Sequence, residues 1–193
     1  MTRTELSRTV DAPTGVVFST VADISNFSEA VPHIERVEFL SEAKWGVGAR
    51  FRETRLMGSR RATTELEVTE YVQDERVRLV SDQGGTVWDT TFTVEPGPDG
   101  RGTRLVMVME ARPYRLGAKL VTPLMKGVVA KAIAADLDAV KAYAEAAGKD
   151  GARCPPVGIL RRDVSVQERP ESPLRSWRRW RSRRRPGSRE PSR

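Results

Sequence analysis

The chain has 193 residues, of which 38% are hydrophobic and 31% charged, enough for one core of ordinary size and too few for two. Its single cysteine excludes an internal disulfide, and its single histidine argues against the histidine clusters of metal sites. No apolar run approaches the roughly 20 residues that span a bilayer, and the N-terminus lacks the apolar core of a secretory signal. We therefore expect a cytoplasmic protein, or a peripheral one on the inner membrane surface.

The net charge of +7 comes from the C-terminal part of the chain. Residues 149–193 hold 14 Lys and Arg against 5 Asp and Glu, which leaves 19 and 21 for residues 1–148. The first 148 residues are thus close to neutral and form the expected domain. The rest is rich in Arg, Pro, Ser and Gly and is predicted to be a disordered tail, because it cannot bury enough apolar surface to offset the entropy of ordering.

Tryptophan alternates with arginine within this tail. Such a segment binds an anionic membrane surface, or binds nucleic acid through charge and stacking, or simply stays solvated, and all three interpretations remain open. The segment comprises Arg175, Trp177, Arg178, Arg179, Trp180, Arg181, Arg183, Arg184 and Arg185.

The N-terminal residues alternate in polarity over 5–10, which predicts a first strand. Asp11, before Ala-Pro, is expected to cap a short helix that runs to Ile24, and a second short helix over 25–31 ends at Pro32. Turn residues then separate stretches of period two, which predict antiparallel strands. These strands are expected at 34–41, 49–57, 61–72, 76–81, 86–95 and 101–112.

After Pro113 the period of apolar residues changes from about two to about 3.6, which predicts a helix over 116–148. Pro123 is expected to kink or divide this helix, and Gly148 to end it. One apolar stripe runs along it, formed by Leu116, Leu120, Leu124, Val128, Ala132, Ile133, Leu137 and Val140.

Several short motifs follow one another along the chain: Val10-Asp11-Ala12-Pro13, Val17-Phe18, 21–27, 32–37, 46–51, 86–92 and Gly102-Thr103-Arg104-Leu105. In this order they resemble the SRPBCC superfamily of START-like and polyketide cyclase/dehydrase-like proteins. The resemblance covers about residues 3–147 and implies a helix-grip fold of the α+β class, in which a curved antiparallel sheet of six to seven strands surrounds a long C-terminal helix.

A helix laid on a curved sheet leaves a volume that side chains fill in part, and the resemblance implies that ligands occupy it. Residues of consistent parity on the strands, together with three from the helix, are the predicted lining. They are Phe51, Glu53, Arg55, Leu66, Val68, Trp88, Thr90, Phe92, Met107, Met109, Leu124, Val128 and Ala132.

Two charged pairs, Glu53 with Arg55 and Glu110 with Arg112, each share one face of a strand because their spacing is two residues. On an inner face such a pair orients a polar group of a ligand or shifts the pKa of a carboxyl group. Sheets carry such pairs more often on the solvent face, where they contribute little.

The sequence offers no catalytic set. His33 follows Pro32 at a helix–strand junction and resembles an exposed polar residue more than a general base. Cys154 lies in the predicted tail, where a preorganised thiolate is not expected. Asp89 has the opposite parity to Trp88 and is expected to point to solvent.

We therefore expect a protein that binds or carries a small hydrophobic molecule, a lipid or a polyketide-like metabolite, without catalytic residue, cofactor or metal ion. An enzyme of the polyketide cyclase/aromatase type is the alternative, which the resemblance permits and the missing acid–base set weakens. A second alternative is an interaction module that associates with a membrane or a ribosome through the basic tail.

Overall fold

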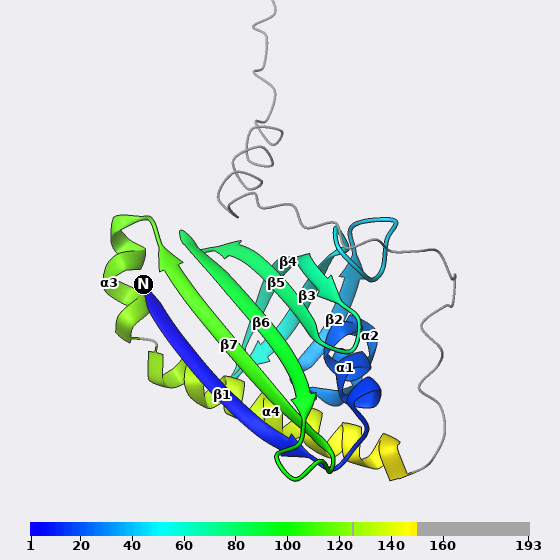
Figure 1. Cartoon of the computed structure of the whole chain (residues 1–193). Coiled ribbons are helices and arrows are strands. Elements are labelled where there is room, and N and C mark those ends of the chain that lie inside the picture. The colour runs from blue at the N-terminus through cyan, green and yellow to red at the C-terminus, as the bar shows by residue number, and fades with distance from the viewer. Residues whose placement is uncertain (125, 150–193) are drawn as a thin grey trace, which may run out of the picture. The chain divides into compact units, whose positions relative to one another are not determined.

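The computed structural model describes residues 1–124 and 126–149. Its strands form one antiparallel sheet of seven in the order β1-β7-β6-β5-β4-β3-β2 (Figure 1). The strands are β1 Thr2–Val10, β2 Ile34–Phe39, β3 Arg50–Met57, β4 Arg60–Val72, β5 Arg76–Gln83, β6 Thr86–Pro96 and β7 Thr103–Pro113. The helices are α1 Thr14–Ala22, α2 Ile24–Ala30, α3 Leu116–Leu124 and α4 Lys126–Lys149.

The long helix α4 lies along one face of the curved sheet, and α1 and α2 cover the end of the same face (Figure 1). This inner face carries the core, in which Phe51, Phe92 and Leu105 of the strands pack with Phe18 of α1 and Leu137 of α4. The arrangement confirms the α+β class and the helix-grip fold predicted from the order of elements. The Arg- and Trp-rich segment of the predicted tail lies outside the described residues.

The start of α1 differs from the prediction that Asp11 caps it. The carbonyl oxygen of Pro13 accepts the first helical hydrogen bonds, from the N–H groups of Val16 and Val17 at 3.0 and 3.1 Å. Pro13 is therefore the N-cap residue, without a side-chain hydrogen bond, and Asp11 lies two residues too early to reach the helix. Its backbone N–H instead donates to Oε1 of Glu145 at 2.9 Å.

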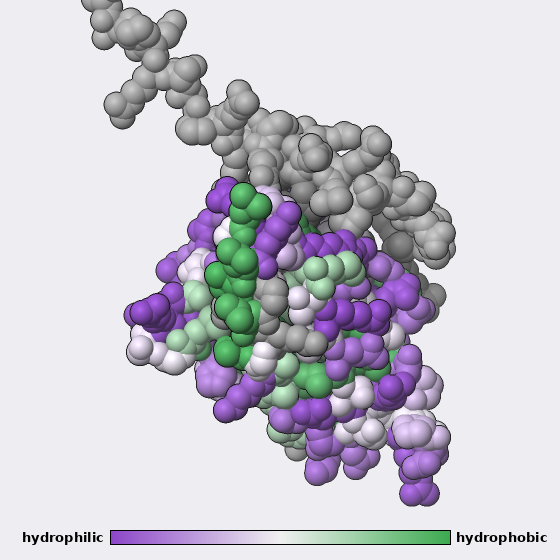
Figure 2. Space-filling model, turned by 90° about the vertical axis from the view of Figure 1, so that its left-hand side faces the viewer, coloured by the Kyte–Doolittle hydropathy of each residue, from purple (hydrophilic) through white to green (hydrophobic). Residues whose placement is uncertain are grey.

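The predicted apolar stripe of the C-terminal helix is divided between two surfaces. Ile133, Leu137, Val140 and Ala144 are buried against the sheet and α1. The earlier members form an apolar band on the outside of α3 and the start of α4 (Figure 2), whereas Thr122 of α3 is buried. Their exposed fractions are 80% for Leu116, 77% for Leu120, 82% for Leu124 and 58% for Val128.

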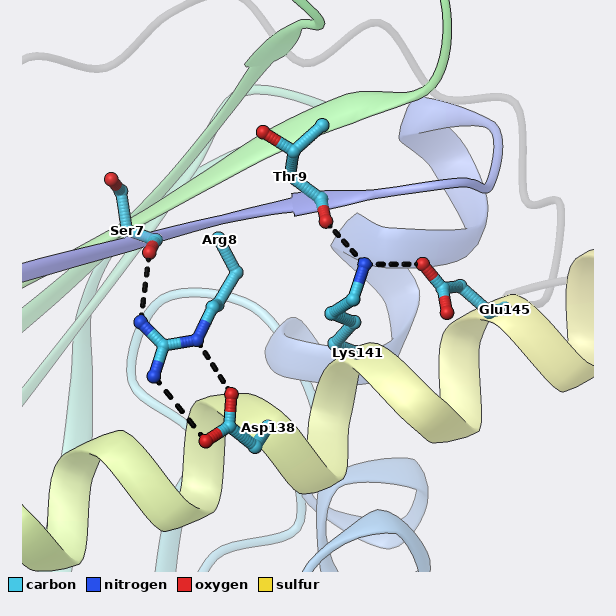
Figure 3. A network of polar contacts seen from close by, with 6 residues as sticks. All are labelled: Ser7, Arg8, Thr9, Asp138, Lys141 and Glu145. Atoms are coloured by element: carbon cyan, nitrogen blue, oxygen red, sulfur yellow. Dashed lines mark hydrogen bonds and ion pairs between the residues drawn. The ribbon is translucent and has the colours of Figure 1, made fainter.

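Polar contacts fix the second half of α4 on β1 (Figure 3). Nε of Arg8 lies 2.6 Å from Oδ1 of Asp138, and Nζ of Lys141 donates to the backbone oxygen of Thr9 and to Oε1 of Glu145, both at 2.5 Å. The contacts between β1 and α4 join one end of the fold to the other, since the partners are more than 120 residues apart. This half of α4 is therefore held from both sides, by the core and by the edge strand.

Gly148 was expected to end the C-terminal helix, but α4 continues to Lys149. A Cβ atom added at Gly148 would lie 3.2 Å from Cβ of Ala12. The missing side chain thus serves close packing of α4 on the segment that follows β1, and not a helix stop.

Candidate ligand-binding site

An open groove of about 450 Å³ lies between α3 and the turn that joins β5 to β6. This volume is within the range of small-molecule sites in proteins. The groove is lined by Gln83, Gly84, Thr86, Trp88, Arg115, Gly117, Ala118, Val121 and Thr122.

Backbone and hydroxyl contacts hold α3 over this groove. The carbonyl oxygen of Gly85 accepts from the N–H of Tyr114 at 2.9 Å, and the hydroxyl groups of Thr86 and Thr122 lie 3.2 Å apart. Gly85 has a φ of +81° and no room for a side chain, because the aliphatic part of Arg115 lies where its Cβ would be. A glycine is needed at this point for both reasons.

Trp88 joins the groove to the interior of the fold. Its half-buried side chain lines the groove and also a small cavity of about 10 Å³ behind it, which has room for at most one water molecule. Met109, Ala111 and Val129 also line this small cavity, together with Thr2 and Thr4 of β1. The ring thus borders both spaces.

Three charged side chains meet inside the fold and form the acid–arginine–acid cluster Glu53–Arg55–Asp136. Nε of Arg55 lies 3.1 Å from Oε1 of Glu53, and its Nη1 lies 2.5 Å from Oδ2 of Asp136. The side chains are 11%, 21% and 11% exposed for Glu53, Arg55 and Asp136. Alternation on β3 places Glu53 and Arg55 on the same face as core residue Phe51, and α4 supplies Asp136 between Ile133 and Val140.

Burial dominates the electrostatics of this cluster. It raises the pKa of the Glu53 carboxyl above the ordinary 4.5, and the neighbouring charge of Arg55 offsets the rise only in part. Burial also opposes the charge of Arg55, but the two carboxylates outweigh it, so the pKa of the guanidinium is raised and it stays protonated. The cluster carries one net negative charge when Glu53 is ionised and none when Glu53 holds its proton.

The structure brings the predicted strand residues together on the inner face. Phe51, Glu53, Val68, Thr90, Phe92 and Met107 are buried there, and Arg55, Leu66, Trp88 and Met109 are half-buried. The three helix residues are placed elsewhere: Leu124, Val128 and Ala132 are exposed on the outer side of α3 and α4.

Sequence reasoning missed Asp136, which had been placed off the apolar stripe. A signal was present, because Val129, Ile133, Asp136 and Val140 recur at spacings of three and four and so share a helix face. The groove residues of the β5–β6 turn were missed because turn composition identifies a turn and does not identify what packs over it.

A second cluster of charges lies on the outer face of the sheet. Glu110 and Arg112 are in contact there, and Asp89 lies between Arg112 and Arg78, whose Nε is 2.7 Å from Oδ1 of Asp89. Asp89 was expected to point to solvent; its parity was right, but the side chain is 5% exposed because the two arginines cover it. This cluster is separate from the inner face and its groove.

No group of three metal-ligating side chains occurs within residues 1–124 and 126–149. The described helices all lack the combination of length and hydrophobicity that crossing a bilayer requires.

A family model described as "Polyketide cyclase / dehydrase and lipid transport" matches residues 1–145. The chain therefore belongs to this family, which confirms the resemblance found in its motifs. A comparison with curated proteins finds no match.

Solved structures with the same fold include TTHA0849 from Thermus thermophilus, at 18% identity and a TM-score of 0.59, covering 76% of this chain and 99% of that one. The Zhui aromatase/cyclase from Streptomyces sp. R1128 shares 20% identity with a TM-score of 0.59, covering 76% and 94%. The di-domain aromatase/cyclase StfQ of steffimycin biosynthesis shares 13% with a TM-score of 0.63, covering 78% of this chain and 52% of that one. At these identities the likeness establishes the fold alone.

Proposed function

We propose that the protein binds a small, mostly apolar molecule that carries a hydroxyl group, with its apolar part beside Trp88 and its hydroxyl at the Glu53–Arg55–Asp136 cluster. The observation that carries the proposal is the cluster itself, since charged groups are rarely left inside a fold unless they are paired or used.

The chemistry of the cluster favours a hydroxyl group over an acid. Two carboxyl groups flank the single guanidinium, so the cluster offers acceptor oxygens and at most one net negative charge. A neutral hydroxyl can donate to a carboxylate oxygen and accept from the guanidinium. A carboxylate or phosphate ligand would meet two like charges and one opposite charge, which disfavours it.

The sheet places the cluster and the groove residue Trp88 on the same inner face. In the strand register Phe51 of β3 lies beside Leu66 of β4, and Ser81 of β5 lies beside Trp88 of β6. These four residues form one row across adjacent strands, next to the row that holds Glu53. The row supports a ligand that enters at the groove and reaches the cluster with its polar end.

Equilibrium dialysis of the full chain against three ligands of one ring system tests the proposal. We expect 1-naphthol to bind more tightly than naphthalene, and naphthalene more tightly than 1-naphthoate. Asp136→Asn should lower the preference for naphthol over naphthoate about tenfold, the effect of one charge-assisted hydrogen bond. Asp138→Asn is the matched control, two residues along the helix and bonded to Arg8 outside the interior.

Trp88→Ala should weaken the binding of all three ligands by a similar factor, because the substitution removes apolar contact and leaves the cluster intact. Binding of naphthoate at least as tight as naphthol, or no binding of any of the three, would rule out a hydroxyl site at this cluster.

A second candidate is cyclisation of a poly-β-ketone, favoured by a carboxyl group of raised pKa in contact with an arginine. Two of the structures with this fold are named as aromatase/cyclases. In such a reaction an enolate carbon bonds to a ketone carbon of the same chain and water then leaves. Protonated Glu53 would donate the proton that departs with the hydroxyl group and would regain a proton from the adjacent carbon as the double bond forms, and Arg55 would stabilise the enolate oxygen.

Incubation with an N-acetylcysteamine thioester of a linear poly-β-ketone tests this candidate, with the loss of water followed by mass spectrometry against a protein-free sample. Glu53→Gln should stop any acceleration of this loss of water. A rate equal to that of the protein-free sample would remove the cyclase candidate and leave the binding function.

A further inference from the structure

The outer side of α3 and the first turn of α4 carry an apolar band that the fold itself does not use, formed by Leu116, Leu120, Leu124 and Val128. Leu116, Leu120 and Leu124 recur at every fourth position and so lie along one side of α3, and Val128 follows in the first turn of α4. Figure 2 shows the band as a continuous green strip with hydrophilic residues on both sides. We refer to these four residues as the α3 band.

The band lies opposite the side of α3 that packs on the body. Thr122 and Ala118 face the groove, and Thr122 is buried in contact with Thr86. On an α-helix, positions 118 and 122 are turned roughly 160° from 116, 120 and 124. The exposure of the leucines is therefore a property of the helix face, and burying them would expose the side that holds α3 in place.

The stretch of sequence that carries the α3 band is positively charged. Residues 111–135 contain five Lys and Arg and no Asp or Glu, although residues 1–148 as a whole carry a small net negative charge. Arg115, Lys119 and Lys131 of this stretch are exposed. An apolar helix face with cations beside it is the pattern of a helix that lies in the interface of an anionic membrane.

We propose that the α3 band docks on the surface of a lipid bilayer that contains anionic lipids. The leucines enter the boundary between headgroups and acyl chains, and Arg115, Lys119 and Lys131 contact the headgroups. A second copy of this chain fits the surface less well, because a symmetric contact would bring the cations of both copies together without an acidic residue from this stretch to pair them.

Docking in this orientation places the groove beside the lipid surface. Val121 and Gly117 belong to α3 and line the groove, and Val121 is itself half exposed next to the α3 band. A molecule dissolved in the bilayer would therefore have a short apolar route to Trp88. The docking proposal stands apart from the ligand proposal, since vesicle binding does not require that any ligand be bound.

Co-sedimentation of the full chain with vesicles tests the docking, using phosphatidylcholine alone and a mixture with phosphatidylglycerol at low salt. The double variant Leu120→Asp, Leu124→Asp should bind the mixed vesicles at least about fivefold more weakly than the wild type. The control double variant Trp45→Asp, Val47→Asp changes the charge equally at exposed apolar residues of the β2–β3 loop, and we expect it to bind within about twofold.

The wild type and both double variants keep the basic tail. If the tail binds the vesicles, the three proteins would therefore bind them with equal affinity, which would overturn the proposal. Circular dichroism must show that both double variants remain folded, which their exposed positions favour. The docking proposal would also be overturned if the wild type forms dimers, the Leu120→Asp, Leu124→Asp variant does not, and both bind vesicles equally well. The α3 band would then bind a second copy of this chain.

Tryptophan emission gives an independent measure of insertion. Leu120→Trp should add a component that shifts to the blue when mixed vesicles are added, compared with the wild type under the same conditions. Val47→Trp should add one that does not shift. Equal behaviour of the two would show that the α3 band stays in water.

Discussion

Arg55 on β3 and Asp136 on α4 lie 81 residues apart in the chain, and their side chains meet with Nη1 2.5 Å from Oδ2. The contact spans the space between sheet and helix, where most neighbours are apolar. Removal of either partner leaves a charge in that space with fewer contacts, so the cluster is expected to matter for folding as well as for binding.

Asp136→Asn should lower the free energy of unfolding by about 2–4 kcal/mol, because it removes the charge that partners a mostly buried guanidinium while Glu53 remains. Asp138→Asn removes a carboxylate of the same helix that is 61% exposed, and should cost less than about 1 kcal/mol. Urea titrations of both variants at neutral pH measure the two values. If both variants lose the same free energy of unfolding, the Glu53–Arg55–Asp136 cluster would be as well solvated as the Arg8–Asp138 pair.

Glu53 should make stability depend on pH in a particular direction. Its folded pKa is raised, mainly by burial, so as pH increases the unfolded chain gives up this proton before the folded chain does. Its contribution to stability is therefore full below the unfolded value, near 4.5, and is lost as the pH rises through the folded value. Glu53→Gln lacks this titration, so the free energy of unfolding of the variant minus that of the wild type should increase from about pH 5 to about pH 8. A difference that is flat or decreases would contradict the raised pKa.

Asp138 and Glu145 should make stability depend on pH in the opposite direction, and at lower pH, than Glu53 does. The hydrogen bond from Arg8 lowers the pKa of Asp138 below 3.8, and the backbone N–H of Asp11, followed by Lys141, lowers that of Glu145 below 4.5. Their stabilisation is present above those ordinary values and is lost as the pH falls through the lowered ones. Glu145→Gln should therefore reduce the loss of stability in acid, with a change of less than about 1 kcal/mol at this partly exposed site. Acid titration of both proteins followed by circular dichroism measures the difference.

Substitutions at two glycines of the β6–β7 loop allow the cost of backbone strain to be measured separately from the cost of a steric clash. Gly100 and Gly102 have φ values of +67° and +62°, but only at Gly102 would a Cβ meet another group, the carbonyl oxygen of Val10 at 2.4 Å. Gly100→Ala should cost about 1–2 kcal/mol from the left-handed conformation alone. Gly102→Ala adds a clash with backbone and should cost about 2–5 kcal/mol. Matching thermal midpoints for the two variants would show that the loop moves away from Val10 at little cost.

Deletion of residues 150–193 should leave the thermal midpoint of the domain within about 5 °C of the full chain, because their composition lacks a core-forming pattern. Differential scanning calorimetry of both proteins measures it. A larger decrease would show that these residues pack on the domain.

Local patterns could predict the order of elements and the parity of the strands, because period two and the turn residues are properties of short segments. Trp88 faces inward and Asp89 outward as the alternation on β6 required. Parity grouped Glu53 and Arg55 with Phe51, but it could not decide whether this charged pair is buried, since both faces of β3 carry charged residues. Asp136, on an element formed 81 residues later, is what pairs with Arg55 on the inner face.

The exposed side of α3 could not be predicted because an apolar stripe with a spacing of four residues does not stay on one face of a helix. Leu124 and Leu137 are 13 residues apart, which corresponds to about 220° around an ideal helix. The apolar residues of the predicted stripe therefore give an exposed side in α3 and a buried side in the second half of α4.

The unequal attachment of the two C-terminal helices has a consequence for hydrogen exchange. The second half of α4 is held by Leu137 and Val140 in the core and by Arg8 and Lys141 at β1, whereas α3 is held mainly through Gly85 and Thr86 at its groove side. Amides of α3 should therefore exchange through small local openings, and those of α4 beyond residue 133 only when the whole domain unfolds. The groove would then widen in a molecule that is otherwise fully native.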